Sequence, residues 1–333
     1  MNWPLWVKWL LWPLSVIYGV VAQVRVWLYA KGILKQHHLH APVISVGNLT
    51  VGGTGKTPMV LWLAERFRDE GKRVGILSRG YRGRAGKSDE VALLHARLGE
   101  KVLFGVGKDR YAQGLELEKQ GVDLFLLDDG YQHLQLARDV NILLMDAAKS
   151  LTHEYLLPAG TLREPLAEMG RADLLVFTRT ETAPRTDAAI EKLQDYPVFS
   201  ATTRLIGFRT LGSSSPLLGA HELGEGPFYA FCGIGNPRAF FLDLQNWNIP
   251  VAAKCEFADH HRYDQRDAHE LEAATLAAGA RALVTTEKDA QNLAGVKFEG
   301  LPVYFAVIAL SLPKEEAFLD TICAKLKSKG SVQ

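Results

Sequence analysis

A loop rich in glycine near residue 50 has the residue types and the spacing that bind phosphate. It starts at Gly47 and ends in Gly55-Lys56-Thr57. In such a loop backbone N–H groups surround phosphate oxygens, the lysine reaches the β- and γ-phosphates, and the threonine hydroxyl binds Mg²⁺. The residues that we expect to bind the nucleotide are Gly52, Gly53, Thr54, Gly55, Lys56 and Thr57. The sequence therefore predicts a nucleotide site with Thr57 as a ligand of Mg²⁺.

The segments around this loop support that prediction. An apolar, β-branched run at 42–46 precedes the loop and a helical pattern from 58 to about 70 follows it, which is the strand–loop–helix context of a P-loop. One position departs from the usual pattern, which has glycine where this chain has Thr50. A plain glycine turn is the alternative, but it would not require the Gly-Lys-Thr sequence.

An acidic pair, Asp128 and Asp129, follows the apolar run 122–127. The carboxyl ends of strands in an open α/β sheet lie at the edge where ligands bind. We therefore expect one of the two carboxylates to hold Mg²⁺, directly or through water. An Asp-Gly turn without a metal is the alternative.

Other polar groups fall in the connections between the expected elements. Three arginines within 79–84 are typical of phosphate recognition, with a solvated basic loop as the alternative. Asp259-His260-His261 combines an acid with imidazoles, as a general base does, and no further ligands support a zinc site there. The residues that we expect to contact the substrate are Arg79, Arg82, Gln132, His133, Arg163 and Glu164.

The pattern of strands and helices indicates the α/β class. Apolar runs at 73–78, 140–145 and 174–178 alternate with helical stretches, which predicts a P-loop NTPase-like, largely parallel sheet with helices on both faces. From about 201 the pattern restarts as a second, smaller α/β domain. We divide the chain into an N-terminal membrane-associated helix at 1–35, a P-loop domain at 36–200, a second domain at 201–312, and a C-terminal helix at 313–333 that packs back on the first domain.

The first 35 residues favour contact with a membrane. Five of the seven tryptophans lie in the first 27 residues, and no acidic residue occurs before Glu65. The apolar run 9–24 would form a helix of about 24 Å, shorter than a hydrocarbon core of about 30 Å. We therefore predict a monotopic helix at the membrane surface, or two helices joined near Pro13. A full span, a cleaved signal peptide and a core helix are the alternatives.

Composition excludes several other classes of protein. Lys and Arg total 38 against 37 Asp and Glu, so the basic surplus of a nucleic-acid binder is missing. Three widely spaced cysteines do not form a disulfide scaffold and fit a reducing compartment. No feature of the sequence points to an obligate protein partner.

A series of motifs is more specific than any one of them. In chain order they are VISVGN, GGTGKTP, SRGYRGR, SDE, DDGYQH, PAGTLREP, GIGNP, FADHH and TTEKD. From the N-terminus to at least Asp289 the chain resembles the tetraacyldisaccharide 4'-kinase family of lipid A biosynthesis in Gram-negative bacteria. The resemblance implies transfer of the γ-phosphate of ATP, with Mg²⁺, to the 4'-hydroxyl of a tetraacylated glucosamine disaccharide 1-phosphate. It also implies a location at the cytoplasmic face of the inner membrane, where the acyl chains of the substrate stay in the bilayer.

The resemblance also implies roles for single residues. Asp89 matches the catalytic aspartate of the family's Gly-Asp-Glu motif, although Ser88 replaces the glycine. Glu90 is then a ligand of the metal or a carboxylate of the surrounding network. His260 matches the histidine that pairs with the catalytic aspartate, and the neighbouring His261 leaves that choice open. If His260 belongs to the second domain, we expect the pair to form only when the domains close around ATP.

A second class of function fits the P-loop and the N-terminal segment alone. A membrane-associated P-loop ATPase or GTPase switch, acting on a protein partner, would share both features. Such a switch needs only a positioned water, whereas a kinase needs a base for the acceptor hydroxyl. Asp89 and His260 therefore discriminate between the two.

Overall fold

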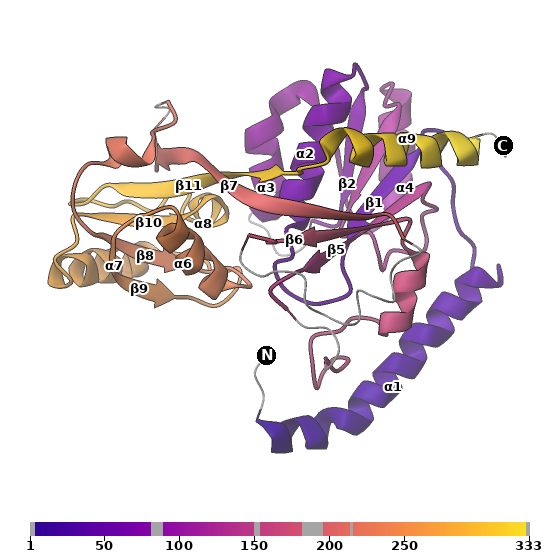
Figure 1. The fold of residues 1–333 in the computed structure, drawn as a ribbon, viewed down its shortest axis with the longest axis horizontal. Helices are drawn as coiled ribbons and strands as arrows, with labels where there is room; N and C mark the ends of the chain where they lie inside the picture. Colours follow the sequence, from indigo (N-terminus) through magenta and orange to yellow (C-terminus); the bar gives the residue numbers. More distant parts are fainter. Residues whose placement is uncertain (1–3, 81–88, 150–153, 182–195, 214–215, 331–333) are drawn as a thin grey trace. The chain divides into compact units, whose positions relative to one another are not determined.

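The computed structural model describes residues 4–80, 89–149, 154–181, 196–213 and 216–330, and these form two compact units (Figure 1). Unit 1 consists of Met1–Tyr81, Leu98–Thr203 and Leu310–Gln333, and unit 2 of Arg82–Arg97 and Arg204–Ala309. The division made from the sequence kept residues 82–97 within 36–200, whereas the structure groups them with unit 2. The ion pair between Arg97 and Glu287, 3.1 Å long, is one of the contacts that hold this segment there.

The sheet of unit 1 is parallel throughout, in the order β3-β2-β4-β1-β5-β6-β7. Its strands are β1 (Val43–Gly47), β2 (Val74–Ser78), β3 (Leu103–Val106), β4 (Leu124–Asp128), β5 (Val140–Asp146), β6 (Leu174–Thr178) and the first half of β7 (Val198–Thr210), which continues into unit 2. Every residue of β1, β2, β4, β5 and β6 is buried, as expected of parallel strands covered on both faces. The predicted class, α/β with a largely parallel sheet, is confirmed.

Helices cover this sheet and extend from it. The helical segments of unit 1 are α1 (Leu5–Ala30), α2 (Lys56–Asp69), η2 (Gly99–Lys101), α4 (Arg110–Lys119), η3 (Leu166–Arg171) and α9 (Glu315–Gly330). Helix α2 packs on β1, β2 and β4, and α4 packs on β2 and β3. The C-terminal helix α9 inserts the buried ring of Phe318 between Trp62 of α2 and Phe199 of β7. The strands that lead into the P-loop therefore lie in a buried core that helices cover.

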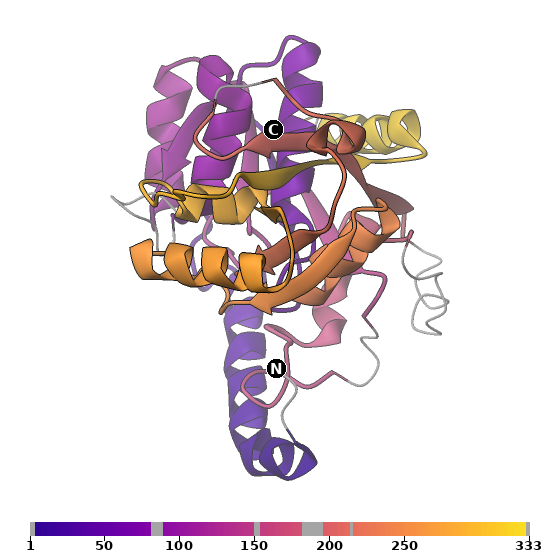
Figure 2. The same cartoon turned by 90° about the vertical axis from the view of Figure 1, so that its left-hand side faces the viewer.

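Unit 2 repeats the α/β arrangement on a smaller scale. Its sheet has the parallel order β11-β10-β8-β9. The strands are β8 (Phe228–Cys232), β9 (Val251–Glu256), β10 (Ala282–Thr286) and β11 (Val303–Ser311), and the helical segments are α3 (Asp89–Leu98), η4 (Ala220–Leu223), α6 (Pro237–Asn246), α7 (Gln265–Ala277) and α8 (Glu287–Asn292). Helices α6, α7 and α8 pack against these strands (Figure 2).

Helix α1 is continuous through Pro13, so the alternative of two helices joined there is wrong. Among the described residues it is the one helix that is long and apolar enough to cross a membrane, by length and composition. In Figures 1 and 2 it runs along the outside of unit 1. Its large side chains are exposed, with Trp9 at 76% and Ile17 at 60%, which excludes the alternative of a core helix.

Candidate active site

The predicted P-loop joins the end of β1 to the start of α2. Gly52 and Gly55 have φ values of 108° and 81°, in the left-handed region that glycine adopts without strain. Lys56 is the first residue of α2, so it stands at a helix N-terminus, where backbone N–H groups are free to meet an anion. The buried Thr54 hydroxyl accepts a hydrogen bond of 2.8 Å from Asn48 Nδ2, which closes the loop.

The position that departs from the usual P-loop pattern has a structural role of its own. Thr50 is buried and pairs in an antiparallel bridge with Leu162. On either side, Val51 N–H donates to the Thr161 carbonyl at 2.8 Å, and Arg163 N–H donates to the Leu49 carbonyl at 2.7 Å. These contacts join the P-loop to the segment 155–164 (the bridging loop). Thr50 is β-branched and therefore favours the extended backbone of this pairing.

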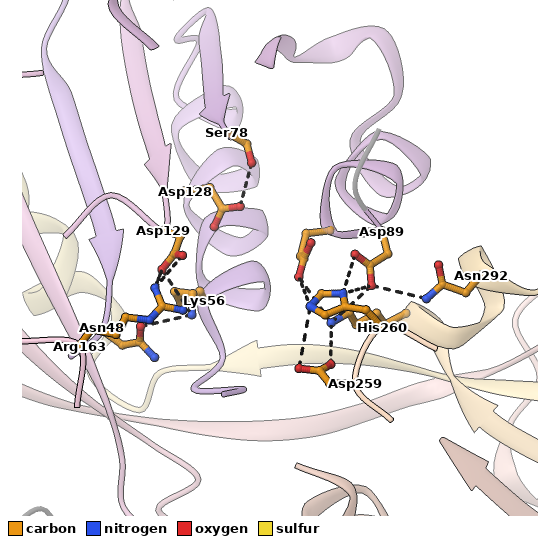
Figure 3. A network of polar contacts seen from close by, with 12 residues as sticks. Asn48, Lys56, Ser78, Asp89, Asp128, Asp129, Arg163, Asp259, His260 and Asn292 are labelled. Atoms are coloured by element: carbon orange, nitrogen blue, oxygen red, sulfur yellow. Dashed lines mark hydrogen bonds and ion pairs between the residues drawn. The ribbon is translucent and has the colours of Figure 1, made fainter. Parts of the chain in front are cut away.

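Two cations meet the carboxylate of Asp129 (Figure 3). Arg163 Nη1 donates to its two oxygens at 2.9 and 2.8 Å, and Lys56 Nζ lies 3.5 Å from Oδ1. Lys56 also donates to Asn48 Oδ1 at 3.3 Å. Burial disfavours the ionised form, but these cations prevail and lower the pKa of Asp129. The carboxylate is therefore a fixed negative charge that holds the P-loop lysine.

The other aspartate of the pair lies at the last position of β4. Asp128 is buried, and its Oδ2 accepts a hydrogen bond of 3.4 Å from the hydroxyl of Ser78, at the end of β2. The Thr57 hydroxyl and the carboxylates of Asp128 and Asp129 are hard oxygen donors, so their chemistry fits Mg²⁺. Arg163 occupies both oxygens of Asp129, and which of the two carboxylates holds a metal stays a prediction.

The predicted substrate residues of unit 1 gather beside the same loop. Gln132 Nε2 donates to the Asn48 carbonyl at 2.9 Å and lies 3.4 Å from Glu164 Oε2. Glu164 is buried and forms an ion pair with Arg171. Burial, together with the nearby Arg110 and Arg138, lowers the pKa of His133 to about 4, so that its imidazole is neutral at pH 7.

The basic motif after β2 is described only in part. Arg79 directly follows the last residue of the strand and is exposed. Arg82, which we also expected to contact the substrate, lies outside the described residues.

The carboxylate of Asp89 and the imidazole of His260 form a pair within unit 2, with 2.9 Å between His260 Nδ1 and Asp89 Oδ2. Asp89 is the first residue of α3, and His260 has a φ of 61°, in the left-handed region, which is uncommon for a residue other than glycine. Because one unit contributes both side chains, the expectation that the pair requires domain closure is wrong. His261 instead bonds Asp267 Oδ2 at 2.9 Å and stacks on Phe257.

The electrostatics of this pair favour an ionised aspartate. Burial alone would raise the pKa of Asp89. The hydrogen bond with His260 and the charge of Lys288 outweigh burial, so the pKa of Asp89 lies well below its usual value. The same hydrogen bond raises the pKa of His260. With Nδ1 turned to Asp89, His260 Nε2 lies on the side of two other carboxylates, 3.8 Å from Asp259 Oδ2 and 4.0 Å from Glu90 Oε1 (Figure 3).

Lys288 and Asn292, whose Nδ2 lies 3.5 Å from Asp89 Oδ2, are residues of this cluster that the sequence did not single out for a role. Lys288 Nζ lies 3.4 Å from Asp89 Oδ2, 3.4 Å from Glu90 Oε1 and 3.4 Å from Asp259 Oδ1. Burial disfavours its charge, but the carboxylates of Glu90 and Asp89 raise the pKa of Lys288. Ligand atoms of Asp89, Glu90 and His260 are close enough together to hold a metal. The Lys288 ammonium offsets part of the negative charge of that group, and the role of Glu90, as a metal ligand or as a carboxylate of this network, stays a prediction. The available signal was the TTEKD motif, of which Lys288 is part.

The remaining motifs of unit 2 build the backbone around His260. Asp289 is fully buried, and its Oδ1 accepts hydrogen bonds of 2.9 Å from Gly233 N–H and from the Tyr263 hydroxyl. The carbonyl of Gly233 in turn accepts from His260 N–H at 3.0 Å. GIGNP, FADHH and TTEKD, far apart in the sequence, therefore meet to fix one imidazole.

Comparison with known proteins adds the family context. A family model described as tetraacyldisaccharide-1-P 4'-kinase matches residues 7–327, which include parts of both units. A tetraacyldisaccharide 4'-kinase of Geobacter sulfurreducens is 40% identical over 334 residues, or 94% of this chain and 91% of that protein. The same kinase of Geobacter metallireducens is 41% identical over 319 residues, or 90% of this chain and 92% of that protein.

A solved structure also matches nearly the whole chain. The crystal structure of the "apo" form of LpxK from Aquifex aeolicus, in complex with ATP, is 34% identical in sequence. It aligns with 96% of this chain and 99% of its own with a TM-score of 0.76.

Proposed function

The chain belongs to the tetraacyldisaccharide-1-P 4'-kinase family, and from this premise we propose how its residues phosphorylate the lipid. The reaction transfers the γ-phosphate of ATP to the 4'-hydroxyl of a tetraacylated glucosamine disaccharide 1-phosphate and gives the bisphosphorylated lipid A precursor. The observation that carries the assignment of roles is the pairing of Asp89 with His260, because a kinase needs a proton acceptor that a nucleotide switch does not.

The P-loop holds the phosphates of ATP in this proposal. Backbone N–H groups from Gly52 to Thr57 surround the β- and γ-phosphates, and Lys56 neutralises charge that spreads over the oxygens during transfer. When Mg²⁺ is bound, by Thr57 and Asp128, it supplies further neutralisation of the phosphate oxygens. Asp129 and Asn48 hold the Lys56 ammonium in place, at 3.5 and 3.3 Å.

The Asp89–His260 pair removes the proton of the acceptor hydroxyl. Asp89 accepts the proton as the hydroxyl attacks, but a carboxylate with a lowered pKa does not retain it. His260, whose pKa is raised, donates Nδ1–H to the ionised Asp89, and when the imidazole is neutral its unprotonated Nε2 takes the proton onward. Lys288 keeps Asp89 ionised before the reaction, and we propose it as a positioning residue of this pair.

Six polar residues serve the substrate or the nucleotide in this proposal. They are Arg163 and Glu164 of the bridging loop, together with Gln132, His133, Arg79 and Arg82. A neutral His133 donates or accepts a hydrogen bond to a sugar hydroxyl at pH 7. Arginines suit the planar, bidentate recognition of phosphate groups.

Helix α1 meets the inner membrane from the cytoplasmic side in this proposal. Its exposed tryptophans and aliphatic side chains suit the headgroup and upper acyl region, and its basic residues suit an anionic leaflet. The acyl chains of the substrate then remain in the bilayer while the disaccharide reaches the site.

The test is transfer of labelled γ-phosphate from Mg²⁺-ATP to detergent-dispersed tetraacyldisaccharide 1-phosphate, alongside ATP hydrolysis without lipid. We expect labelled bisphosphorylated lipid and little hydrolysis in the absence of lipid. Hydrolysis without transfer to lipid would instead indicate the nucleotide switch and would contradict the proposal.

A further inference from the structure

Helix α1 turns its smallest side chains toward unit 1 and its largest side chains outward. Among its described side chains only Ser15 and Gly19 are buried, and they lie one helical turn apart. Trp9, Ile17 and Val21 are each at least 60% exposed. A helix of a soluble core shows the opposite arrangement. The contact of α1 with the rest of the chain is therefore made by small and polar groups, and it is narrow.

That contact falls on the bridging loop. The Ser15 hydroxyl donates a hydrogen bond of 2.9 Å to the Leu156 carbonyl and accepts one of 3.0 Å from Ala159 N–H. A Cβ atom on Gly19 would lie 2.6 Å from Leu156 Cδ1, so a larger residue there would displace the Leu156 side chain. One turn of α1 thus fixes the first half of the bridging loop.

A second hydrogen bond reaches the far end of the same loop. The Tyr18 hydroxyl donates to the Arg163 carbonyl at 2.8 Å. Arg163 is then held at three points, because its N–H donates to the Leu49 carbonyl and its guanidinium binds Asp129. Asp129 in turn contacts Lys56. A continuous series of direct contacts therefore runs from α1 to the lysine of the P-loop.

We propose that Ser15 and Tyr18 are positioning residues for phosphoryl transfer. From α1 they fix the bridging loop, which sets both the backbone of the P-loop at 49–51 and the guanidinium of Arg163. The helix that we place at the membrane therefore also determines the geometry at the nucleotide. The inference rests on the proposed function, and all of its contacts lie within unit 1.

A double-mutant cycle tests whether Tyr18 acts through Arg163. Tyr18→Phe removes one hydroxyl from a side chain that keeps its ring, and we expect kcat/KM for ATP to fall about fivefold. In an Arg163→Ala background the same substitution should have a smaller effect on kcat/KM, because the guanidinium is gone and only the contact with the P-loop backbone remains to be positioned. Equal effects of Tyr18→Phe in the two backgrounds would overturn the proposal, since a merely structural role is independent of Arg163.

Tyr29→Phe is the matched control. It removes the same atom from the same helix, and its hydroxyl forms no hydrogen bond with the described residues. We expect it to match the wild type in kcat/KM. Ser15→Ala should resemble Tyr18→Phe, with co-sedimentation on phosphatidylethanolamine–phosphatidylglycerol vesicles unchanged. Wild-type rates in Ser15→Ala and Tyr18→Phe would also overturn the proposal.

A failure of the proposed function would be distinguishable from a failure of this inference. If the wild type transfers no phosphate to lipid, the kinase assignment fails. The dissociation constant of a fluorescent N-methylanthraniloyl ATP can be measured for the same four proteins of the cycle. It still reports whether Tyr18 and Arg163 are coupled. An additive result in that measurement contradicts the positioning role on its own.

Discussion

The polar clusters of the two units solve different problems with the same kinds of side chain. In unit 1, Lys56 and Arg163 meet the single carboxylate of Asp129, so cations are in surplus. In unit 2, Lys288 meets three carboxylates, those of Asp89, Glu90 and Asp259. A surplus of cations suits the binding of a polyphosphate, whereas a surplus of carboxylates suits the removal of a proton.

The clusters also differ in how the chain assembles them. The P-loop is one continuous segment between a strand and a helix. The pair in unit 2 joins residues 171 positions apart, and three motifs hold its backbone. The unit 1 cluster is therefore recognisable from a short stretch of sequence, whereas the unit 2 pair was expected only from the family resemblance and its contacts depend on the fold.

The largest expected effect separates the two clusters by function. Asp89→Asn should lower kcat about 10²- to 10⁴-fold, because the proton acceptor is lost, while ATP affinity changes less than twofold. Lys56→Met, by contrast, should weaken both transfer and ATP binding. The measurements are steady-state transfer to lipid and titration with a fluorescent ATP analogue. The exposed Asp320→Asn is the control, and a loss of ATP affinity in Asp89→Asn would contradict the division of roles.

Removal of the lysine in unit 2 should have the next largest effect. Lys288→Met leaves three neighbouring carboxylates without their common cation, so Asp89 and His260 shift and kcat falls about ten- to a hundredfold at unchanged KM for ATP. Lys288→Arg should restore part of the rate. Lys254→Met, at an exposed position of the same unit, is the control. Wild-type kcat in Lys288→Met would show that the lysine positions nothing.

The pH dependence should follow the raised pKa of His260. Its imidazole takes up the proton only when neutral, so the rate rises with pH through a pKa above 6.5 and falls about tenfold for each unit below it. An NMR titration of the imidazole should give that pKa in the wild type and a lower one in Asp89→Asn, which lacks the ionised partner. The same pKa in both proteins would mean that the hydrogen bond with Asp89 does not set the pKa of His260.

The smallest expected effect concerns the pairing of Thr50 in the P-loop with Leu162 in the bridging loop. Thr50→Gly restores the usual P-loop residue but loses β-branched packing and adds backbone freedom, at a cost of about 1 kcal/mol in the free energy of unfolding. Thermal unfolding should show a Tm lower by about 2 °C, with kcat within twofold of the wild type. An unchanged Tm would indicate that the pairing with Leu162 contributes nothing to stability.

Much of the fold was predictable because its signals are local. The β6 prediction at 174–178 has the same bounds in the structure, and the strand predictions at 73–78 and 140–145 differ from it by one residue each. Parallel strands that are buried on both faces have continuous apolar sequences, which can be recognised within a short stretch of the chain. The separation of helix α3 from the first domain was not predictable, because the contacts that decide it, such as Arg97 with Glu287, join distant segments.

The candidate sites divide in the same way. The sequence alone determined the P-loop, the acidic pair after β4 and an apolar N-terminal helix, because glycine freedom, strand ends and hydropathy act over a few neighbouring residues. Only the tertiary structure decided that His260 rather than His261 faces Asp89, that Lys288 is their common counter-ion, and that Thr50 pairs with the bridging loop. The physical reason is the sequence separation of the groups involved. Backbone propensity and hydropathy depend on neighbouring residues in the chain, whereas these ion pairs and hydrogen bonds join residues that only folding brings together.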